Sequence, residues 1–265
     1  MAAGEHRWVE AGSACDIPFA ADPAVARDTL EGLIPAVDVI VQPEARRRRR
    51  LLVADMDSTM ISVECLDELA DYAGKKAEIA KVTEQAMRGE IEFGKALCAR
   101  VELLTGLDES AIERCYAERV QVTPGALELV RTMRREGAYC LLVSGGFSRF
   151  ADRVAQDIGF DRAVSNELVV EAGRLTGAVR RPIVGAAGKR QALVDAATAS
   201  GVSLGACVAV GDGANDIPML EAAGLGIAYH AKPSVAAAAS ARIEHNDLTA
   251  LLYAQGYKRS QWETA

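Results

Sequence analysis

Three short apolar runs divide the chain, and each ends abruptly in polar or glycine-rich residues. The runs are residues 51–54, 140–143 and 207–210, and they are followed by Asp55, by Ser144-Gly145-Gly146 and by Gly211-Asp212-Gly213. Apolar runs without alternation are typical of strands covered on both faces of a parallel sheet. Since helical periodicity lies between the runs, the pattern predicts a doubly wound α/β core. Ligands of such folds bind beyond the carboxyl ends of the strands, so we expect the three polar segments to converge on one site.

A helical segment interrupts this alternation between residues 66 and 123. Its apolar positions recur at helical spacing over residues 79–87 and again over residues 93–104. An all-helical insertion directly after the first core strand predicts a small cap over the site. We therefore expect a core made of residues 48–65 and 124–265, with residues 66–123 as its cap.

The first 47 residues form a weakly patterned preface that is too short for a confident domain, which favours the remnant of a longer one. Within it, residues 23–33 predict a helix and residues 37–41 a strand. The basic run from Arg46 to Arg50 abuts the first apolar run. We interpret this run as a solvated lead-in rather than a nucleic-acid patch.

Composition narrows the class of protein. Half of the 265 residues are apolar, which is enough for a substantial core. The net charge of −7 and the pI of about 5.2 argue against a nucleic-acid partner, because phosphate backbones favour a basic face. Six cysteines without metal-site spacing indicate free thiols in a reducing cytoplasm. Without a signal-peptide pattern or a membrane-length apolar run, the sequence predicts a soluble cytoplasmic protein with no membrane partner, and it leaves the oligomeric state open.

Two aspartates directly follow the first apolar run. An isolated aspartate at this place would be interpreted as a helix cap, but Asp55 and Asp57 are two residues apart and precede Ser58-Thr59. A carboxylate can attack phosphorus to form an acyl phosphate, which splits a difficult hydrolysis into two steps. The reaction then needs a second carboxyl group to protonate the leaving alcohol and to activate water. Asp55 and Asp57 fit these two roles.

A second acidic cluster, Gly211 to Asp216, would alone be interpreted as a solvated turn. Beside Asp55 it indicates an all-oxygen site for a hard cation such as Mg²⁺. Ser144 and the amides after it offer donors for phosphoryl oxygens. Lys189, which opens a helical pattern, is a candidate for the cation that offsets developing charge, although lysine is usually only a surface residue.

Taken in chain order, these segments resemble the four motifs of the haloacid-dehalogenase-like phosphohydrolase superfamily over roughly residues 50–250. The sequences DMDST, VSGGF and GDGANDIPML are similar to those of the phosphoserine phosphatase family. The resemblance implies Mg²⁺-dependent hydrolysis of O-phospho-L-serine, the last step of serine biosynthesis, with Asp55 as nucleophile and Asp57 as general acid and base. It also implies the following sets: metal ligands Asp55, Asp57 (through its backbone carbonyl) and Asp212; phosphate ligands Ser144, Gly145, Gly146 and Lys189; a supporting role for Asn215 at the substrate and for Asp216.

The expected cap carries a candidate pair for the two ends of an amino acid. Arg100 lies in the apolar stripe that begins at Phe93, where a guanidinium is costly without a partner. Arginine suits bidentate binding of a carboxylate. Glu64 could bind an ammonium, although a first-turn glutamate can also simply face a helix dipole. The phosphoserine phosphatase family has a Glu, a Met, a Phe and an Arg at places matching Glu64, Met87, Phe93 and Arg100, and both Met87 and Phe93 also fit a core role.

Three other functions stay open on the sequence alone. Phosphoryl transfer to a small alcohol such as homoserine would use the same aspartyl phosphate. A phosphatase for another small metabolite is disfavoured by Glu64 and Arg100. A non-catalytic phospho-ligand binding module is disfavoured by the intact pair Asp55 and Asp57, because a binder gains nothing from a nucleophile beside an anion. Longer members of the resembled family carry regulatory domains, and the preface is too short for a complete one.

Overall fold

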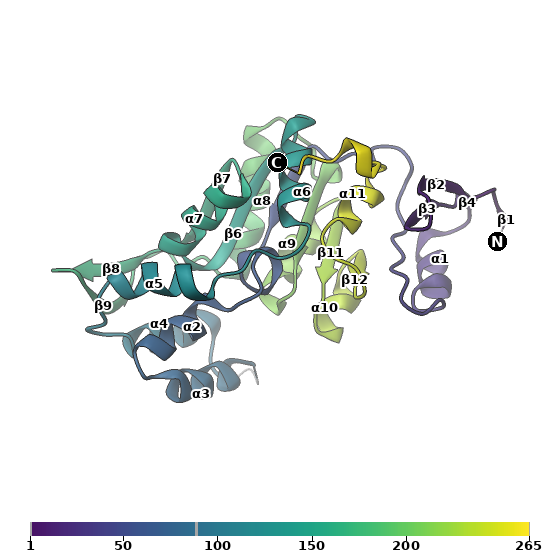
Figure 1. Cartoon of the computed structure of the whole chain (residues 1–265). Helices are drawn as coiled ribbons and strands as arrows, with labels where there is room; N and C mark the ends of the chain where they lie inside the picture. Colours follow the sequence, from purple (N-terminus) through teal and green to yellow (C-terminus); the bar gives the residue numbers. More distant parts are fainter. Residues whose placement is uncertain (1, 88–89, 265) are drawn as a thin grey trace.

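The computed structural model of the protein describes residues 2–87 and 90–264. A sheet of six strands lies at its centre, in the order β12-β11-β10-β5-β6-β7 (Figure 1). The strands are β5 (Leu51–Ala54), β6 (Tyr139–Phe147), β7 (Arg162–Asn166), β10 (Cys207–Gly211), β11 (Leu225–Tyr229) and β12 (Ala241–Ile243). Every pairing in this sheet is parallel, and the three apolar runs fall on β5, β6 and β10. The predicted doubly wound α/β fold is confirmed.

Helices cover both faces of the sheet. One face carries α6 (Ala126–Arg135), α7 (Ser148–Ile158) and α11 (Ala250–Ala254), and the other carries α8 (Ala186–Ala199), α9 (Ile217–Ala222) and α10 (Pro233–Ala238). In β5, Leu52 and Ala54 pack into the core under α6, α7 and α11, whereas Leu51 and Val53 pack into the core under α8, α9 and α10. All four side chains are fully buried, which explains why this run does not alternate with polar residues.

The carboxyl ends of β5, β6 and β10 lie level with one another. Ala54 pairs with Leu142 of β6 and with Val210 of β10, so the polar segments that follow emerge at one edge of the sheet. Residues 144–146, which were expected to follow a strand, belong to β6 instead. The strand continues to Phe147 through an irregularity in its pairing with β7.

Between β5 and β6 the chain forms α2 (Cys65–Tyr72), α3 (Lys76–Met87), α4 (Phe93–Glu102) and α5 (Ser110–Arg119), as the helical pattern predicted. The two connections to the core run side by side, with Ile61 bridged to Val122 and the Ser62 amide donating to the Gln121 carbonyl at 2.9 Å. These helices lie at the end of the molecule opposite the N-terminal segment (Figure 1).

A hairpin that the sequence did not predict joins these helices to the core. It consists of β8 (Leu168–Glu171) and β9 (Arg174–Val179), and β9 packs against α4. The Gly106 amide donates to the Leu175 carbonyl at 2.8 Å, and the Leu175 amide donates to the Leu107 carbonyl at 2.9 Å. Gly177 has a φ of +81°, and a Cβ there would collide with Thr105, so glycine permits this close approach.

The N-terminal segment forms two small antiparallel pairs and one helix. They are β1 (Ala2–Ala3) with β4 (Phe19–Ala20), β2 (Arg7–Glu10) with β3 (Ala14–Asp16), and α1 (Pro23–Leu30). The predicted helix begins at Pro23, where the Asp22 side chain caps it, but ends three residues earlier than expected. Residues 37–41, all of them described, form no strand, so that prediction was wrong. Asp38 instead accepts hydrogen bonds from the backbone amides of residues 244–246.

The interpretation of the basic run as a solvated lead-in was wrong for two of its members. Arg47 forms a bidentate ion pair with Asp16 at 2.5 and 2.9 Å. Arg49 is only 5% exposed and donates to Gln42 and to the Gly205 carbonyl, both at 2.8 Å. These arginines tie the N-terminal segment to the sheet, because charged groups leave water only where partners replace it.

Within the described ranges, no helix combines the length and apolarity needed to cross a bilayer. All six cysteines, each in the described part of the chain, are free, and four of them are buried. No disulfide therefore contributes to the fold among these residues.

Candidate active site

Asp55 stands where β5 leaves the sheet, in a turn formed by Met56–Met60. Its backbone amide donates to the Val210 carbonyl of β10 at 2.9 Å, and its Oδ1 accepts from the Met56 amide at 2.8 Å. Asp55 is 6% exposed. Burial and the charge of Asp216 raise the pKa of Asp55 well above its ordinary value, although Lys189 opposes the rise.

Asp57 is held by the start of α2 and by the end of β6. Its Oδ1 accepts from the Cys65 amide at 2.9 Å, and its Oδ2 accepts from the Ser144 hydroxyl at 3.2 Å. The Gly146 amide donates to Ser144 Oγ at 2.8 Å, and a Cβ on Gly146 would lie 2.9 Å from Asp57 Oδ2. Burial raises the pKa of Asp57, and the hydrogen bond from Cys65 partly offsets it. A carboxyl group with a raised pKa is suited to donate a proton.

Lys189 lies at the centre of the site with no exposed surface. Its Nζ donates to Asp55 Oδ1 at 2.5 Å and to Asp216 Oδ1 at 2.7 Å. Burial works to lower the pKa of Lys189, but the carboxylates of Asp216 and Asp55 outweigh it and raise the pKa. The second Asp216 oxygen accepts from the Gly213 amide at 3.0 Å. A side chain at Gly211 would overlap the Asp216 carboxyl group, so this packing needs glycine.

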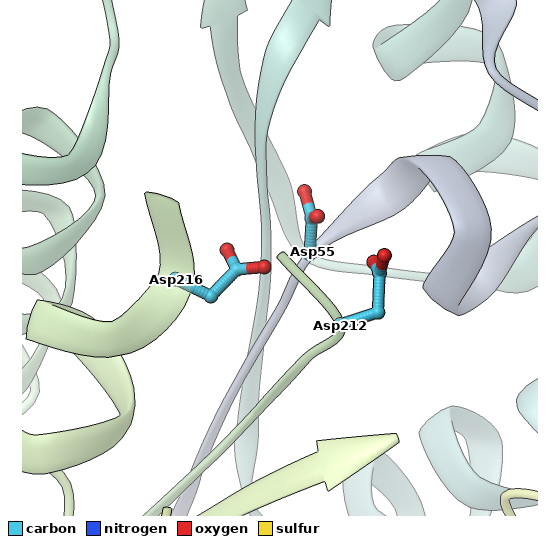
Figure 2. Close-up of side chains that lie close together, drawn as sticks. All are labelled: Asp55, Asp212 and Asp216. Atoms are coloured by element: carbon cyan, nitrogen blue, oxygen red, sulfur yellow. The ribbon is translucent and has the colours of Figure 1, made fainter. Parts of the chain in front are cut away.

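Three carboxylates from two motifs share one space at the ends of β5 and β10. Oxygens of Asp55, Asp212 and Asp216 all lie within 4.8 Å of one another. Figure 2 shows how the three side chains gather in this space. Asp212 Oδ1 accepts from the Thr59 hydroxyl at 3.0 Å. Burial and the charge of Asp216 raise the pKa of Asp212 to about 6. An all-oxygen cluster whose own charges repel one another fits a hard divalent cation.

A cavity of about 130 Å³ opens over these carboxylates. It is smaller than the roughly 300–1,000 Å³ of drug-sized ligand sites, which indicates a small ligand. The residues that line it are Asp55, Asp57, Glu64, Leu66, Phe93, Leu97, Arg100, Gly145, Gly146, Phe147, Asp212, Gly213 and Asn215. The structure thus brings predicted residues from the core and from α4 to one cavity, whereas Ser144, Lys189 and Asp216 are not part of its lining.

Glu64 and Arg100 place opposite charges on the wall of this cavity. Glu64 Oε1 accepts from the Ser58 hydroxyl at 2.7 Å. Glu64 is an exposed residue, but partial desolvation of its carboxyl group and the charge of Asp57 raise its pKa to about 7. Arg100 is partly buried, which lowers its pKa. Both groups therefore gain from an oppositely charged ligand group.

Phe93 connects α4 to two glycines of the core. Its ring atoms lie 3.2 Å from the position of a Cβ on Gly145 and 3.0 Å from that of a Cβ on Gly185. Asn215 lines the cavity near Gly145. Met87 ends α3, and its side chain lies outside the described residues, so the structure does not test its expected role.

Sequence reasoning missed residues that position this site. Asn166, 1% exposed, donates to the Gly145 carbonyl at 2.9 Å and accepts from the Val184 amide at 2.7 Å. It thereby fixes the end of β6 and the segment before α8, the two places that Phe93 contacts. The signal that singled out Asp55 was absent here, because Asn166 ends the mixed strand Arg162–Asn166 instead of an apolar run.

A larger cavity, of about 370 Å³, lies away from this chemistry between α1 and α10. Its wall includes Glu31, which pairs with both Arg27 and Arg242. Because these charges are already matched, we place the candidate site in the smaller cavity.

Comparisons with known proteins agree with this geometry. The family model described as haloacid dehalogenase-like hydrolase matches residues 52–221. A phosphoserine phosphatase of Streptomyces coelicolor is 47% identical over 83% of this chain, which spans only 53% of that protein's length. A phosphoserine phosphatase of Albidiferax ferrireducens is also 47% identical, over 77% of this chain and 88% of the relative. A solved structure described as a phospho-aspartyl intermediate analogue of phosphoserine phosphatase superposes with a TM-score of 0.73, at 37% identity, over 78% of this chain and 98% of that one.

Proposed function

This chain belongs to the haloacid dehalogenase-like hydrolase family, and from that premise we propose that it hydrolyses O-phospho-L-serine to L-serine and phosphate. One observation carries the choice of substrate. A small cavity has the buried carboxylate of Asp55 together with Glu64 and Arg100 on its wall. O-phospho-L-serine offers a phosphate for Asp55 to attack, an ammonium group for Glu64 and a carboxylate for Arg100. The names of the relatives from Streptomyces and Albidiferax support the same substrate.

In the proposed reaction, an Asp55 oxygen attacks phosphorus while Asp57 gives its proton to the serine oxygen that leaves. Water then attacks the phosphoryl group of the aspartyl phosphate, and Asp57 takes a proton from that water. Lys189 donates to Asp55 at 2.5 Å, so its positive charge would lie beside a phosphoryl group carried by Asp55. Ser144, Gly145 and Gly146 complete the proposed phosphate site. Of these, the Gly146 amide already donates a hydrogen bond to Ser144 Oγ and so orients the hydroxyl group.

We assign the cation site to the carboxylates of Asp55 and Asp212 and to the backbone carbonyl of Asp57. Asp216 can reach the same space, but Lys189 and Gly213 occupy both of its oxygens, so its role is to support the site. The oxygen donor set fits Mg²⁺, which would neutralise phosphoryl charge and polarise the phosphorus–oxygen bonds.

The helices of residues 66–123 are proposed as a cap on the core formed by residues 48–65 and 124–265. In this division Arg100 and Phe93 come from the cap, and the phosphate and metal sites come from the core. Glu64 stands at the connection, where it would bind the ammonium group while Arg100 binds the carboxylate. Met87 and Phe93 would close the apolar side, and Asn215 the side of the phosphate.

The test is phosphate and serine release from O-phospho-L-serine by the purified chain in Mg²⁺ buffer. Release should stop with EDTA and return with excess Mg²⁺. Ca²⁺ should support it poorly, because Ca²⁺ takes more ligands and can hold the Asp55 carboxylate in bidentate fashion. Equal amounts of serine and phosphate, with no phosphoryl product when homoserine is added, would separate hydrolysis from transfer. Binding of O-phospho-L-serine without release would point to the non-catalytic alternative and refute the proposal.

A further inference from the structure

Leu97 lies on the cavity-facing side of α4, between two residues that the proposed function uses. Phe93, Leu97 and Arg100 are spaced four and three residues apart on this helix, and all three line the cavity. Residues at these spacings lie one above another on one side of a helix. Leu97 therefore stands between the Phe93 ring and the Arg100 side chain along the same wall.

The two ends of this wall belong to different parts of the proposed binding site. The Phe93 ring lies 3.2 Å from the position of a Cβ on Gly145, in the proposed phosphate site. Arg100 is the proposed site of the substrate carboxylate. In O-phospho-L-serine the β-carbon bears the phosphate and connects it to the carbon that bears the carboxylate. Because Leu97 stands between the two ends, it would lie beside this β-carbon in the proposed binding mode.

The wall at Leu97 has little freedom to recede. Leu97 is 2% exposed and packs into the core under α6, α7 and α11. Leu66 of α2, also buried, lines the same cavity, whose volume is about 130 Å³. Closely packed side chains shift only at a cost, because a movement that relieves one contact strains others or leaves a void. A larger group on the substrate β-carbon would therefore meet a wall that does not yield.

The plainer explanation is that Leu97 is only a core side chain that happens to border the cavity. Val101, one turn further along α4, distinguishes the two explanations. It is fully buried in the same core but is not part of the cavity lining. Shortening Val101 therefore removes core packing alone, whereas shortening Leu97 also enlarges the cavity.

We infer that Leu97 is a specificity-determining residue that excludes substrates with a methyl group on the carbon that bears the phosphate, such as O-phospho-L-threonine. The inference rests on the proposed function, because the places of the phosphate and the carboxylate are taken from it.

The experiment compares Leu97→Ala with Val101→Ala. For each protein, kcat/KM is measured with O-phospho-L-serine, O-phospho-L-threonine and O-phospho-L-allo-threonine, and the Tm is recorded. Both threonine diastereomers are used because the methyl group points to a different side in each. The wild type should prefer O-phospho-L-serine at least about tenfold over both, as is typical of one added carbon in an apolar pocket. Leu97→Ala should reduce this preference about tenfold for at least one diastereomer. Val101→Ala should lower the Tm and leave the preference unchanged.

Two further variants keep the inference testable if Leu97→Ala folds poorly. Leu97→Val shortens the side chain by one carbon and should reduce the preference by a smaller factor. Leu97→Met keeps a similar volume and should retain the preference of the wild type.

The outcomes separate the inference from the proposed function. The inference alone is overturned if folded Leu97→Ala and Leu97→Val keep the full preference against both diastereomers, or if Val101→Ala loses as much of it. Equal kcat/KM of the wild type on O-phospho-L-serine and O-phospho-L-threonine would also overturn the inference alone. A wild-type chain that releases no phosphate from O-phospho-L-serine would overturn the proposed function, and this inference with it.

Discussion

Replacing Lys189 by Met removes the only cation that contacts both Asp55 and Asp216 among the described residues. Methionine fills a similar volume, so the change isolates the charge. It leaves two buried carboxylates, at 6% and 0% exposure, without a counter-charge. Removing one partner from a buried ion pair typically costs about 3–5 kcal/mol. With an m-value near 3 kcal/mol/M, the urea midpoint should fall by roughly 1–1.7 M.

The assay is urea unfolding in EDTA, with Arg190→Met as the control. Arg190 is the next residue on α8 and is exposed, so its replacement should change the free energy of unfolding by less than about 0.5 kcal/mol. Adding Asp216→Asn to Lys189→Met should restore about 1–2 kcal/mol, because one of the uncompensated charges is removed. If Lys189→Met lowered the free energy of unfolding by less than about 1 kcal/mol, or if the double variant regained none of it, the reasoning would be refuted.

The same variant has a pH signature. The folded-state pKa of Asp55 is already above its unfolded value of roughly 3.9. Without Lys189 this pKa rises further, since Lys189 is the charge that lowers it. A group whose pKa is raised on folding contributes stability below the unfolded pKa and loses it as the pH rises through the folded pKa. The free energy of unfolding of Lys189→Met should therefore fall further below that of the wild type from pH 4 toward pH 8. A difference that shrinks over this range would contradict the role of Lys189 as the charge that lowers the pKa of Asp55.

Three other variants test the site. Asp55→Asn should reduce phosphate release to background while thermal unfolding stays near that of the wild type, because Asn keeps the shape and loses the nucleophile; substantial turnover would exclude the aspartyl phosphate. Arg100→Ala should lower kcat/KM for O-phospho-L-serine about tenfold to a hundredfold, the equivalent of losing a charged hydrogen bond of about 1.5–3 kcal/mol, and spare p-nitrophenyl phosphate. Equal losses on both substrates would make Arg100 a structural residue. Gly185→Ala places a Cβ 3.0 Å from Phe93 Cδ1 and should raise KM about tenfold by displacing the ring, so an unchanged KM would show that the ring adapts.

The core of the fold was predictable because burial on both faces of a sheet leaves a clear trace in the sequence. Leu51 and Leu52 face opposite cores, so neither position tolerates a polar residue. The level carboxyl ends of parallel strands then make sequence-distant Asp55 and Asp212 neighbours, which is why the polar segments that follow three apolar runs could be expected to meet.

The errors lie where tertiary contacts decide the structure. Residues 37–41 have strand-forming side chains, but Asp38 binds three backbone amides through its carboxylate, and no described strand pairs with this segment. Arg47 and Arg49 were interpreted as solvated because their partners, Asp16 and the Gly205 carbonyl, are distant in the chain. Asn166 escaped notice for the same reason, since its hydrogen bonds join the end of β6 to the segment before α8, which only the folded chain brings together.

The hydrogen bonds between β9 and residues 106–107 affect the two ends of α4 differently. The C-terminal end of this helix is held against a hairpin of the core, whereas its N-terminal end reaches the core through the Phe93 ring. A ring contact can be lost and regained without breaking any backbone hydrogen bond. A tilt of α4 about its C-terminal end would therefore break the ring contacts of Phe93 and leave these main-chain hydrogen bonds in place. Sequence changes around Phe93 would affect that end of the helix alone.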